Sequence, residues 1–260
     1  MSMSRRSLLG GVTLTSASAV LPRAMLAQDA GTPVAGSDQA GTPEAVAVPG
    51  YAIARVRVLP TAELNQAIFP NVMHQYLPQI QAVPGFTGYV FGFDSADPAA
   101  SISLHFMTDA DAAAATEDVS AGYVASLDAR FAVETPLADS GPLRVFGVTD
   151  RPSSELPPFL HGAAVTSRQR QTAPGADIEA VVTQATEELL PMLAAMEGFV
   201  LYAWIQTETG RTAINIWETA EQMAAGDQAV ADYVAQNTIS TTVGEPIVHS
   251  GTVGYAFGIV

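Results

Sequence analysis

Two matching stretches decide how this chain folds: LPQIQAVPGF at residues 77–86 and LPMLAAMEGF at residues 190–199. Leu-Pro opens both stretches, Gly-Phe closes both, and the apolar positions between them agree. Similarity at a fixed separation within one chain is the sequence signature of a repeated structural unit. These stretches therefore predict that the same fold occurs twice along the chain.

More matches follow each stretch in the same order. Tyr-Val-Ala, for example, recurs at residues 123–125 and 233–235. Chance can produce one such match but not an ordered series, so we predict an internal duplication with units at residues 51–150 and 151–260. The other matches join Tyr89 and Phe91 to Tyr202 and Trp204, residues 106–108 to 217–219, 136–141 to 246–251, and 145–148 to 256–259.

Each unit reads as strand, helix, strand, strand, helix and strand. Alternating apolar residues mark the strands, and longer alanine-rich segments mark the helices. The expected strands are 52–58, 87–93, 101–106, 142–148, 160–166, 200–207, 211–217 and 252–259, and the expected helices are 62–83, 109–130, 177–196 and 220–237.

Signals at the helix ends support these assignments. Gly85 and Gly198 suit helix C-termini, where a left-handed backbone is common, and Thr108 and Thr219 suit N-caps. Proline interrupts the helical hydrogen-bond ladder. The prolines at residues 78 and 191 therefore predict a shared kink or a short 3₁₀ segment near the end of each unit's first helix.

The order βαββαβ is the ferredoxin-like arrangement of the α+β class, a four-stranded sheet with helices on one face only. The open face of such a sheet must be covered. Two units in one chain, joined across residues 149–158, can cover each other.

Specific residues of both units also resemble those of a known protein superfamily. The triplets at residues 84–86 and 197–199, and the aromatic residue and threonine that end each third strand, resemble the dimeric α/β-barrel superfamily and its antibiotic-biosynthesis-monooxygenase-like domains. The resemblance spans nearly all of residues 51–260. It implies tandem ferredoxin-like repeats that form one intramolecular dimeric α/β barrel, with ligand pockets between the helices and the sheet of each repeat.

The resemblance leaves the activity open, because fold alone does not choose a function. The superfamily includes cofactor-independent monooxygenases, haem-degrading enzymes and small-molecule isomerases. If the protein is an enzyme, the resemblance favours a monooxygenase-like oxidoreductase. No cofactor motif is evident in the sequence, and haem is the cofactor that the resemblance allows.

The N-terminus carries a targeting signal. Arg5 and Arg6 stand directly before an apolar run at residues 8–21, which resembles a twin-arginine signal; an ordinary secretory signal or an uncleaved anchor is the alternative. We expect a signal peptide at residues 1–27 and a flexible linker at residues 28–50. The protein would then be periplasmic, cell-surface or secreted, without stable membrane insertion after cleavage.

Composition limits the partners. The chain has 26 acidic and 11 basic residues, and no cysteine. All the basic residues are arginine, and once three leave with the signal, 8 remain against 26 acids, a net charge of −18. Such a charge repels nucleic acids. Internal pairing of the two units predicts a monomer, whose stability comes from burial because no disulfide can form.

Aromatic residues on the second strands are the candidate ligand-binding groups. Tyr89, Phe91 and Phe93 share one strand face, and Tyr202 and Trp204 share the matching face. They either fill the core or line a pocket for a flat apolar molecule. Tyr89, Phe91, Tyr202 and Trp204 are therefore the candidates for ligand binding.

Candidates for catalysis are fewer. Four histidines, at positions 74, 105, 161 and 249, lack metal-ligand spacing, so we expect no metal site. His105 is the candidate for proton transfer or haem ligation. Asn215 and Trp217 share a face of a third strand, but the first unit has Leu104 and Phe106 there, so superfamily roles are not carried over to them.

Arg55 and Arg57 alternate on the first strand. They could bind an anion, but a solvated edge or pairing with acids is the simpler interpretation.

Three hypotheses remain. The first is an exported protein that binds a small apolar or aromatic molecule in a pocket lined only by apolar and aromatic side chains. The second is a cofactor-independent monooxygenase or haem-handling enzyme, which requires a pocket that contains an ionisable group with a displaced pKa. The third is a ligand-free structural or interaction module, whose cores would be filled.

Overall fold

The computed structural model describes residues 49–237 and 242–259. The expected signal peptide and nearly all of the expected linker lie outside these residues. The strands are β1 (Tyr51–Val58), β2 (Phe86–Asp94), β3 (Ala100–Met107), β4 (Glu134–Val148), β5 (Ala164–Thr172), β6 (Phe199–Gln206), β7 (Gly210–Trp217) and β8 (Thr242–Phe257). The α-helices are α1 (Ala62–Asn71), α2 (Leu77–Gln81), α3 (Ala110–Ser126), α4 (Ile178–Gln184), α5 (Leu190–Ala194) and α6 (Ala220–Gln236).

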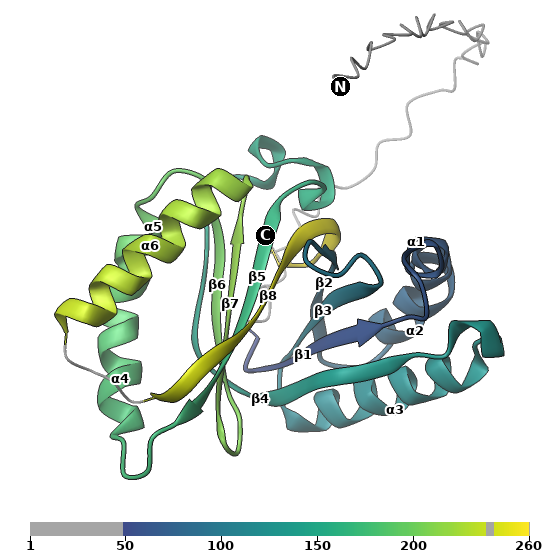
Figure 1. Ribbon diagram of the computed structural model, residues 1–260, viewed down its shortest axis with the longest axis horizontal. Coiled ribbons are helices and arrows are strands. Elements are labelled where there is room, and N and C mark those ends of the chain that lie inside the picture. Colours follow the sequence, from purple (N-terminus) through teal and green to yellow (C-terminus); the bar gives the residue numbers. More distant parts are fainter. Residues whose placement is uncertain (1–48, 238–241, 260) are drawn as a thin grey trace, which may run out of the picture. The chain divides into compact units, whose positions relative to one another are not determined.

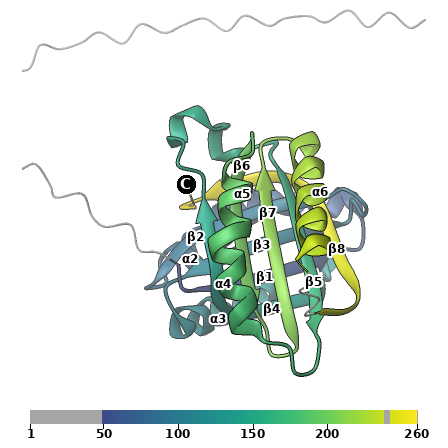
Figure 2. The ribbon, with the colours of Figure 1, turned by 90° about the vertical axis from the view of Figure 1, so that its left-hand side faces the viewer.

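The eight strands form one closed antiparallel barrel in the order β1-β3-β2-β8-β5-β7-β6-β4. Strands β1–β4 form the first half and β5–β8 the second, and the pairs β2–β8 and β4–β6 join the halves. The two groups of helices lie on opposite sides of the barrel (Figure 1), and α4, α5 and α6 cover β6 and β7 (Figure 2). The expected α+β class and closed barrel are confirmed.

A π-helical turn interrupts the first helix of each half, at Val72–Tyr76 and at Ala185–Leu189. In both turns the backbone N–H of the following leucine donates to the carbonyl five residues earlier. A proline comes next and has no N–H to donate, so the wider turn shifts the hydrogen bonds by one residue. The expected irregularity is present, but it is a π turn rather than a 3₁₀ segment.

The capping residues follow the sequence signals only in part. The expected C-caps at Gly85 and Gly198 are wrong, because α2 and α5 end at Gln81 and Ala194, and Ala82 and Ala195 are their C-caps. The two glycines lie in the turns before β2 and β6, with φ of 83° and 78°, the left-handed conformation that glycine tolerates best. The side chain of Thr219 accepts a hydrogen bond from the N–H of Gln222, as expected for an N-cap. The expected N-cap at Thr108 is wrong, because Asp109 caps α3.

Strand pairing corrects the sequence alignment of the two halves by one residue. Tyr89 pairs with His105 on β3, and Tyr202 pairs with Asn215 on β7. His105 is therefore the counterpart of Asn215, and Met107, rather than Phe106, is the counterpart of Trp217. A shift of one residue moves a side chain to the other face of a strand, so this correction changes which residues share a site.

The starts of three expected strands also change. β5 begins at Ala164 instead of at residue 160, because the connecting segment contains 3₁₀ turns at Ser153–Glu155 and Pro158–Leu160. The last strand of each half begins earlier than expected, at Glu134 and at Thr242.

Small and aliphatic side chains fill the barrel interior, among them Ala52, Ala54, Val90 and Leu104. The opposite faces of the same strands pack against the helices, where Tyr89 and Tyr202 belong to separate clusters. The candidate aromatic residues therefore face the two helix layers. Within the described residues, no helix has both the length and the apolarity needed to cross a membrane.

Candidate functional site

A pocket of about 580 Å³ lies between the helices and the sheet of the second half. Ala213 of β7 and Tyr202 of β6 lie on its sheet side, and Ala185, Leu189 and Val230 lie on its helix side. Its volume is within the range of small-molecule sites. We call it the second-half pocket.

The corresponding space in the first half is filled. The void there measures about 20 Å³, roughly the room for one water molecule. Tyr76 at the end of the first π turn takes the place that Leu189 has in the second, and its ring lies 4.9 Å from that of Tyr123. Phe69 likewise corresponds to the smaller Val182 and packs 5.2 Å from Phe91. Larger rings close the first half, and smaller side chains leave the second half open.

Arginines give one end of the second-half pocket a positive charge. Arg170 of β5 and Arg211 of β7 are directly paired across the two strands, and both line the pocket. The guanidinium of Arg211 lies 4.5 Å from the ring centre of Trp204. Burial lowers the pKa of Arg211 below its usual range, and the charge of Arg170 adds to this effect. Arginine nonetheless stays protonated at neutral pH.

A third arginine is neutralised. Arg168 donates to both carboxylate oxygens of Asp227 on α6, at 3.1 and 2.9 Å. The first half has the same ion pair between Arg55 of β1 and Glu117 of α3. These pairs tie the first strand of each half to its second helix.

The structure gathers three of the predicted second-half residues at the pocket. Tyr202, Trp204 and Asn215 line it. The Oδ1 atom of Asn215 and the indole N–H of Trp204 are buried and have no hydrogen-bond partner among the described residues. Trp217 does not line the pocket; its ring packs at 5.6 Å from Phe199 in the core.

The predicted first-half residues lie in a filled core. Tyr89 and Phe91 are buried beside the small void. His105 is fully buried, with its Nε2 2.8 Å from the Tyr76 hydroxyl and its Nδ1 3.5 Å from an Arg55 nitrogen. Burial lowers the pKa of His105 well below its usual value, and the charges of Arg55 and Arg57 lower it further. His105 and Asn215 occupy corresponding positions on β3 and β7, in different halves. The structure does not bring them together in one site.

The first-strand arginines are not a solvated edge. Arg55 is 3% exposed and ion-paired, which confirms the expected pairing with an acid. Arg57 donates to the hydroxyl of Ser120 on α3, at 2.5 Å.

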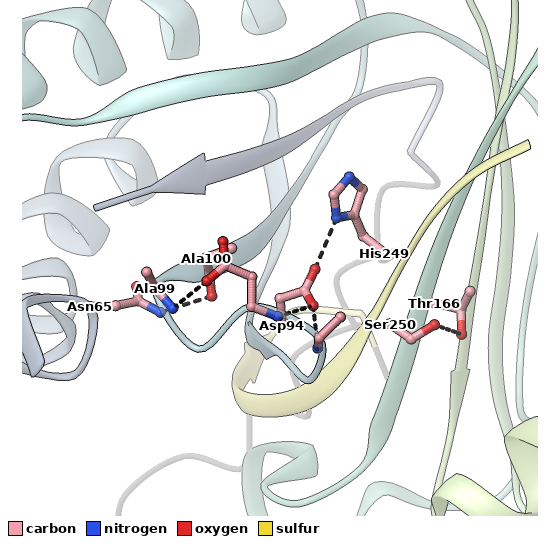
Figure 3. A network of polar contacts seen from close by, with 9 residues as sticks. Asn65, Asp94, Ala99, Ala100, Thr166, His249 and Ser250 are labelled. Atoms are coloured by element: carbon pink, nitrogen blue, oxygen red, sulfur yellow. Dashed lines mark hydrogen bonds and ion pairs between the residues drawn. The ribbon is translucent and has the colours of Figure 1, made fainter. Parts of the chain in front are cut away.

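The other histidines lie apart from the second-half pocket. His249, at a position expected to be a loop, is on β8, and its Nδ1 lies 2.9 Å from a carboxylate oxygen of Asp94 (Figure 3). The other Asp94 oxygen accepts from the N–H groups of Ala96 and Asp97, which fixes the carboxylate in place. In the described part of the chain, no cluster of three or more His, Asp or Glu side chains could hold a metal ion.

Two of the described residues that line the second-half pocket are of a type that can ligate haem iron, and both are tyrosines. Protein ligands to haem iron are His, Cys, Met or Tyr side chains, and the described lining residues include only Tyr202 and Tyr233 of these types. Burial raises the pKa of Tyr202 and raises that of Tyr233 to about 12. Both effects disfavour the tyrosinate that iron would need.

Sequence reasoning missed Arg170 and Arg211, the two arginines at one end of this pocket. It considered Arg55 and Arg57 but not their counterparts Arg168 and Arg170, and it did not consider Arg211. The pairing of Arg55 with Ser103 and of Arg168 with Ala213 shows that these arginines correspond. A repeat alignment in the correct register would have pointed to Arg168 and Arg170.

Solved structures with the same fold are known. A candidate monooxygenase from Lactobacillus acidophilus NCFM superposes with a TM-score of 0.59 at 10% identity, over 80% of this chain and 96% of that one. A candidate monooxygenase from Fusobacterium nucleatum gives 0.58 at 10% identity, over 81% and 95%. An anthrone oxidase-like protein gives 0.55 at 11% identity, over 82% and 94%.

At such low identities these likenesses show a shared fold alone. No family model matches the sequence, and no curated protein matches it.

Proposed function

We propose that this protein binds a small aromatic molecule in its second-half pocket. The observation that carries the proposal is the difference between the halves: the same helix–sheet space holds about 580 Å³ in one and about 20 Å³ in the other. A ligand-free module would be expected to fill both spaces to native density. The expectation that only apolar and aromatic side chains line the pocket is wrong, because Arg168, Arg170 and Arg211 are among the lining residues.

Calorimetric titration with 1-naphthamide, a neutral two-ring aromatic, tests this proposal. Ala231 and Ala224 are both exposed residues of α6, but only Ala231 lines the pocket. We expect Ala231→Phe to weaken binding roughly ten-fold or more, which corresponds to at least about 1.4 kcal/mol. Ala224→Phe is the matched control and should bind like the native chain. Equal affinity in both variants, or failure of both 1-naphthamide and its carboxylate counterpart 1-naphthoate to bind the native chain, would refute the proposal.

A cofactor-independent monooxygenase is the second candidate. It is favoured by Asn215, whose buried Oδ1 has no hydrogen-bond partner among the described residues and lies at the pocket wall. Such an atom costs free energy unless a ligand or a water satisfies it. We expect oxygen uptake with a hydroquinone substrate, and its loss in Asn215→Leu. Uptake that is unchanged in this variant, or no uptake by the native chain, would remove this candidate.

We also propose that residues 1–27 direct export by the twin-arginine route. The support is the pair Arg5 and Arg6 before an apolar run. Replacing both with lysine should keep the protein in the cytoplasmic fraction of the producing cell. Export of the double variant at the native level would contradict the proposal.

The two halves, we propose further, arose by duplication and form a monomer. The support is the repeated order of elements and the repeated ion pairs of Arg55 and Arg168. A barrel closed within one chain needs no second copy. Light scattering after size exclusion should give the mass of one chain, and a dimer mass would contradict this.

A further inference from the structure

We propose that the ligand of the second-half pocket is an aromatic carboxylate whose carboxyl group binds between Arg170 and Arg211. This inference rests on the proposed binding function and names the class of ligand. The rest of the ligand would lie over Ala213 and against the apolar side chains of α4, the π turn and α6.

The placement of the two arginines is the first argument. They are directly opposite each other on β5 and β7, so both side chains rise from the same face of the sheet. Like charges in directly opposed positions destabilise a sheet. Burial lowers the pKa of both arginines, the charge of Arg168 lowers the pKa of Arg170 further, and the charge of Arg170 lowers the pKa of Arg211 further. An anion between them would remove this repulsion.

Available acids do not neutralise the pair. Asp227, the acid among the lining residues, is held by both guanidinium nitrogens of Arg168. The charge of Glu245 raises the pKa of Arg170. Among the side chains that the structure describes, however, neither Arg170 nor Arg211 forms an ion pair. The pocket therefore keeps an excess of positive charge in a protein whose net charge is −15.

The first half supplies an internal comparison. The counterpart of Arg170 is Arg57, which pairs across the strands with Ser101 instead of a second arginine. Arg57 donates one hydrogen bond to the Ser120 hydroxyl of α3, and the space above it is filled. The second arginine thus occurs in the half that has a pocket and is missing from the half that lacks one.

The remaining dimensions fit an aromatic acid. Arg211 and Asn215 both line the pocket four residues apart on β7, which spans about 13 Å at the usual rise of a strand. Between them lies Ala213, and the apolar side chains on the opposite wall include Val181, Leu189 and Val230. The fork of a guanidinium matches the two oxygens of a carboxylate, so the charged group of the ligand belongs at the Arg211 end and its rings belong toward Asn215.

Two matched probes test the inference on the full chain. 1-Naphthoate and 1-naphthamide have the same rings and nearly the same shape, but only the first is an anion at neutral pH. We expect naphthoate to bind roughly ten- to hundred-fold more tightly, in keeping with charge-assisted hydrogen bonds. Arg170→Gln and Arg211→Gln should each reduce this preference and leave the affinity for naphthamide unchanged. Arg57→Gln, the corresponding change in the filled half, should leave the preference intact.

The outcomes separate this inference from the binding function. Equal binding of the two probes, or a preference unchanged in both pocket variants, overturns the carboxylate assignment and leaves the binding function standing. Tighter binding of 1-naphthyl phosphate than of naphthoate also overturns it, in favour of a phosphate ester. Failure of every probe to bind refutes the binding function itself, and the inference with it.

Discussion

His105 should make the stability of this protein depend on pH. The side chain is fully buried, between the Tyr76 hydroxyl and the guanidinium of Arg55. Burial and then the charge of Arg55 hold its pKa well below 6.5. The folded protein therefore keeps His105 neutral at a pH where the unfolded chain would already protonate it.

The sign and size follow from proton linkage. Above about pH 7.5, His105 is neutral in both states and does not contribute to pH dependence. Below the unfolded pKa of 6.5 the unfolded state binds the extra proton, so the free energy of unfolding falls as the pH falls. One pKa unit corresponds to about 1.36 kcal/mol, so the loss is about 1.4 kcal/mol at about pH 5.5. The loss continues until the folded pKa is reached.

His105→Asn isolates this contribution. Asparagine occupies the corresponding position, 215, in the second half, and it does not titrate. Urea unfolding of the native chain and the variant at about pH 7.5, 6.5 and 5.5 should show the native chain losing about 1.4 kcal/mol more than the variant between the extremes. Exposed His74→Asn is the control and should follow the native chain. Parallel pH curves for the native chain and His105→Asn would refute the reasoning.

Three other changes should lower the free energy of unfolding, measured by urea titration. Leu193→Ala removes a fully buried side chain of α5 and should cost about 2–5 kcal/mol; a cost under about 1 kcal/mol would contradict its place in the core. Gly198→Ala should cost about 1–3 kcal/mol, because φ is 78° and the added Cβ would collide with Gln222; a stabilised variant would contradict this. Glu117→Gln should cost about 1–3 kcal/mol, since it leaves the buried Arg55 guanidinium without its carboxylate, although solvent reaches Glu117 itself, whereas Glu179→Gln, in an exposed pair, should cost under about 1 kcal/mol. Equal costs for the two changes would contradict this reasoning.

Much of the fold could be predicted from local signals. Gly85 and Gly198 both have the left-handed backbone that they suggested, because this conformation depends on a few residues in sequence, but they lie in the turns after the helices and not at the C-caps, Ala82 and Ala195. The prolines after the two π turns likewise marked a break in each first helix, since a missing N–H is a local fact. The type of break was not predictable, because a π turn and a 3₁₀ turn both accommodate proline and packing against the sheet selects between them.

The site could be predicted only in part. Tyr202 and Trp204 were recognised from their alternation on one strand, which reveals a shared face but not whether that face meets solid core or a pocket. Tyr89 and Phe91 have the same alternation and lie in a filled core. The difference comes from Tyr76 and Leu189, at corresponding positions in the two π turns far from either strand in sequence.

The sequence by itself determined the repeated βαββαβ order, the left-handed glycines before the second strand of each half and the acidic, cysteine-free character, because each depends on the residues of one segment or on composition. Only the tertiary structure decided the register that makes His105 the counterpart of Asn215, and the pairing that sets Arg170 opposite Arg211. Cross-strand pairing joins residues that are far apart in the chain, and one residue of slip exchanges the two faces of a strand. Whether a helix–sheet interface is filled or open therefore depends on side chains from several elements meeting in space.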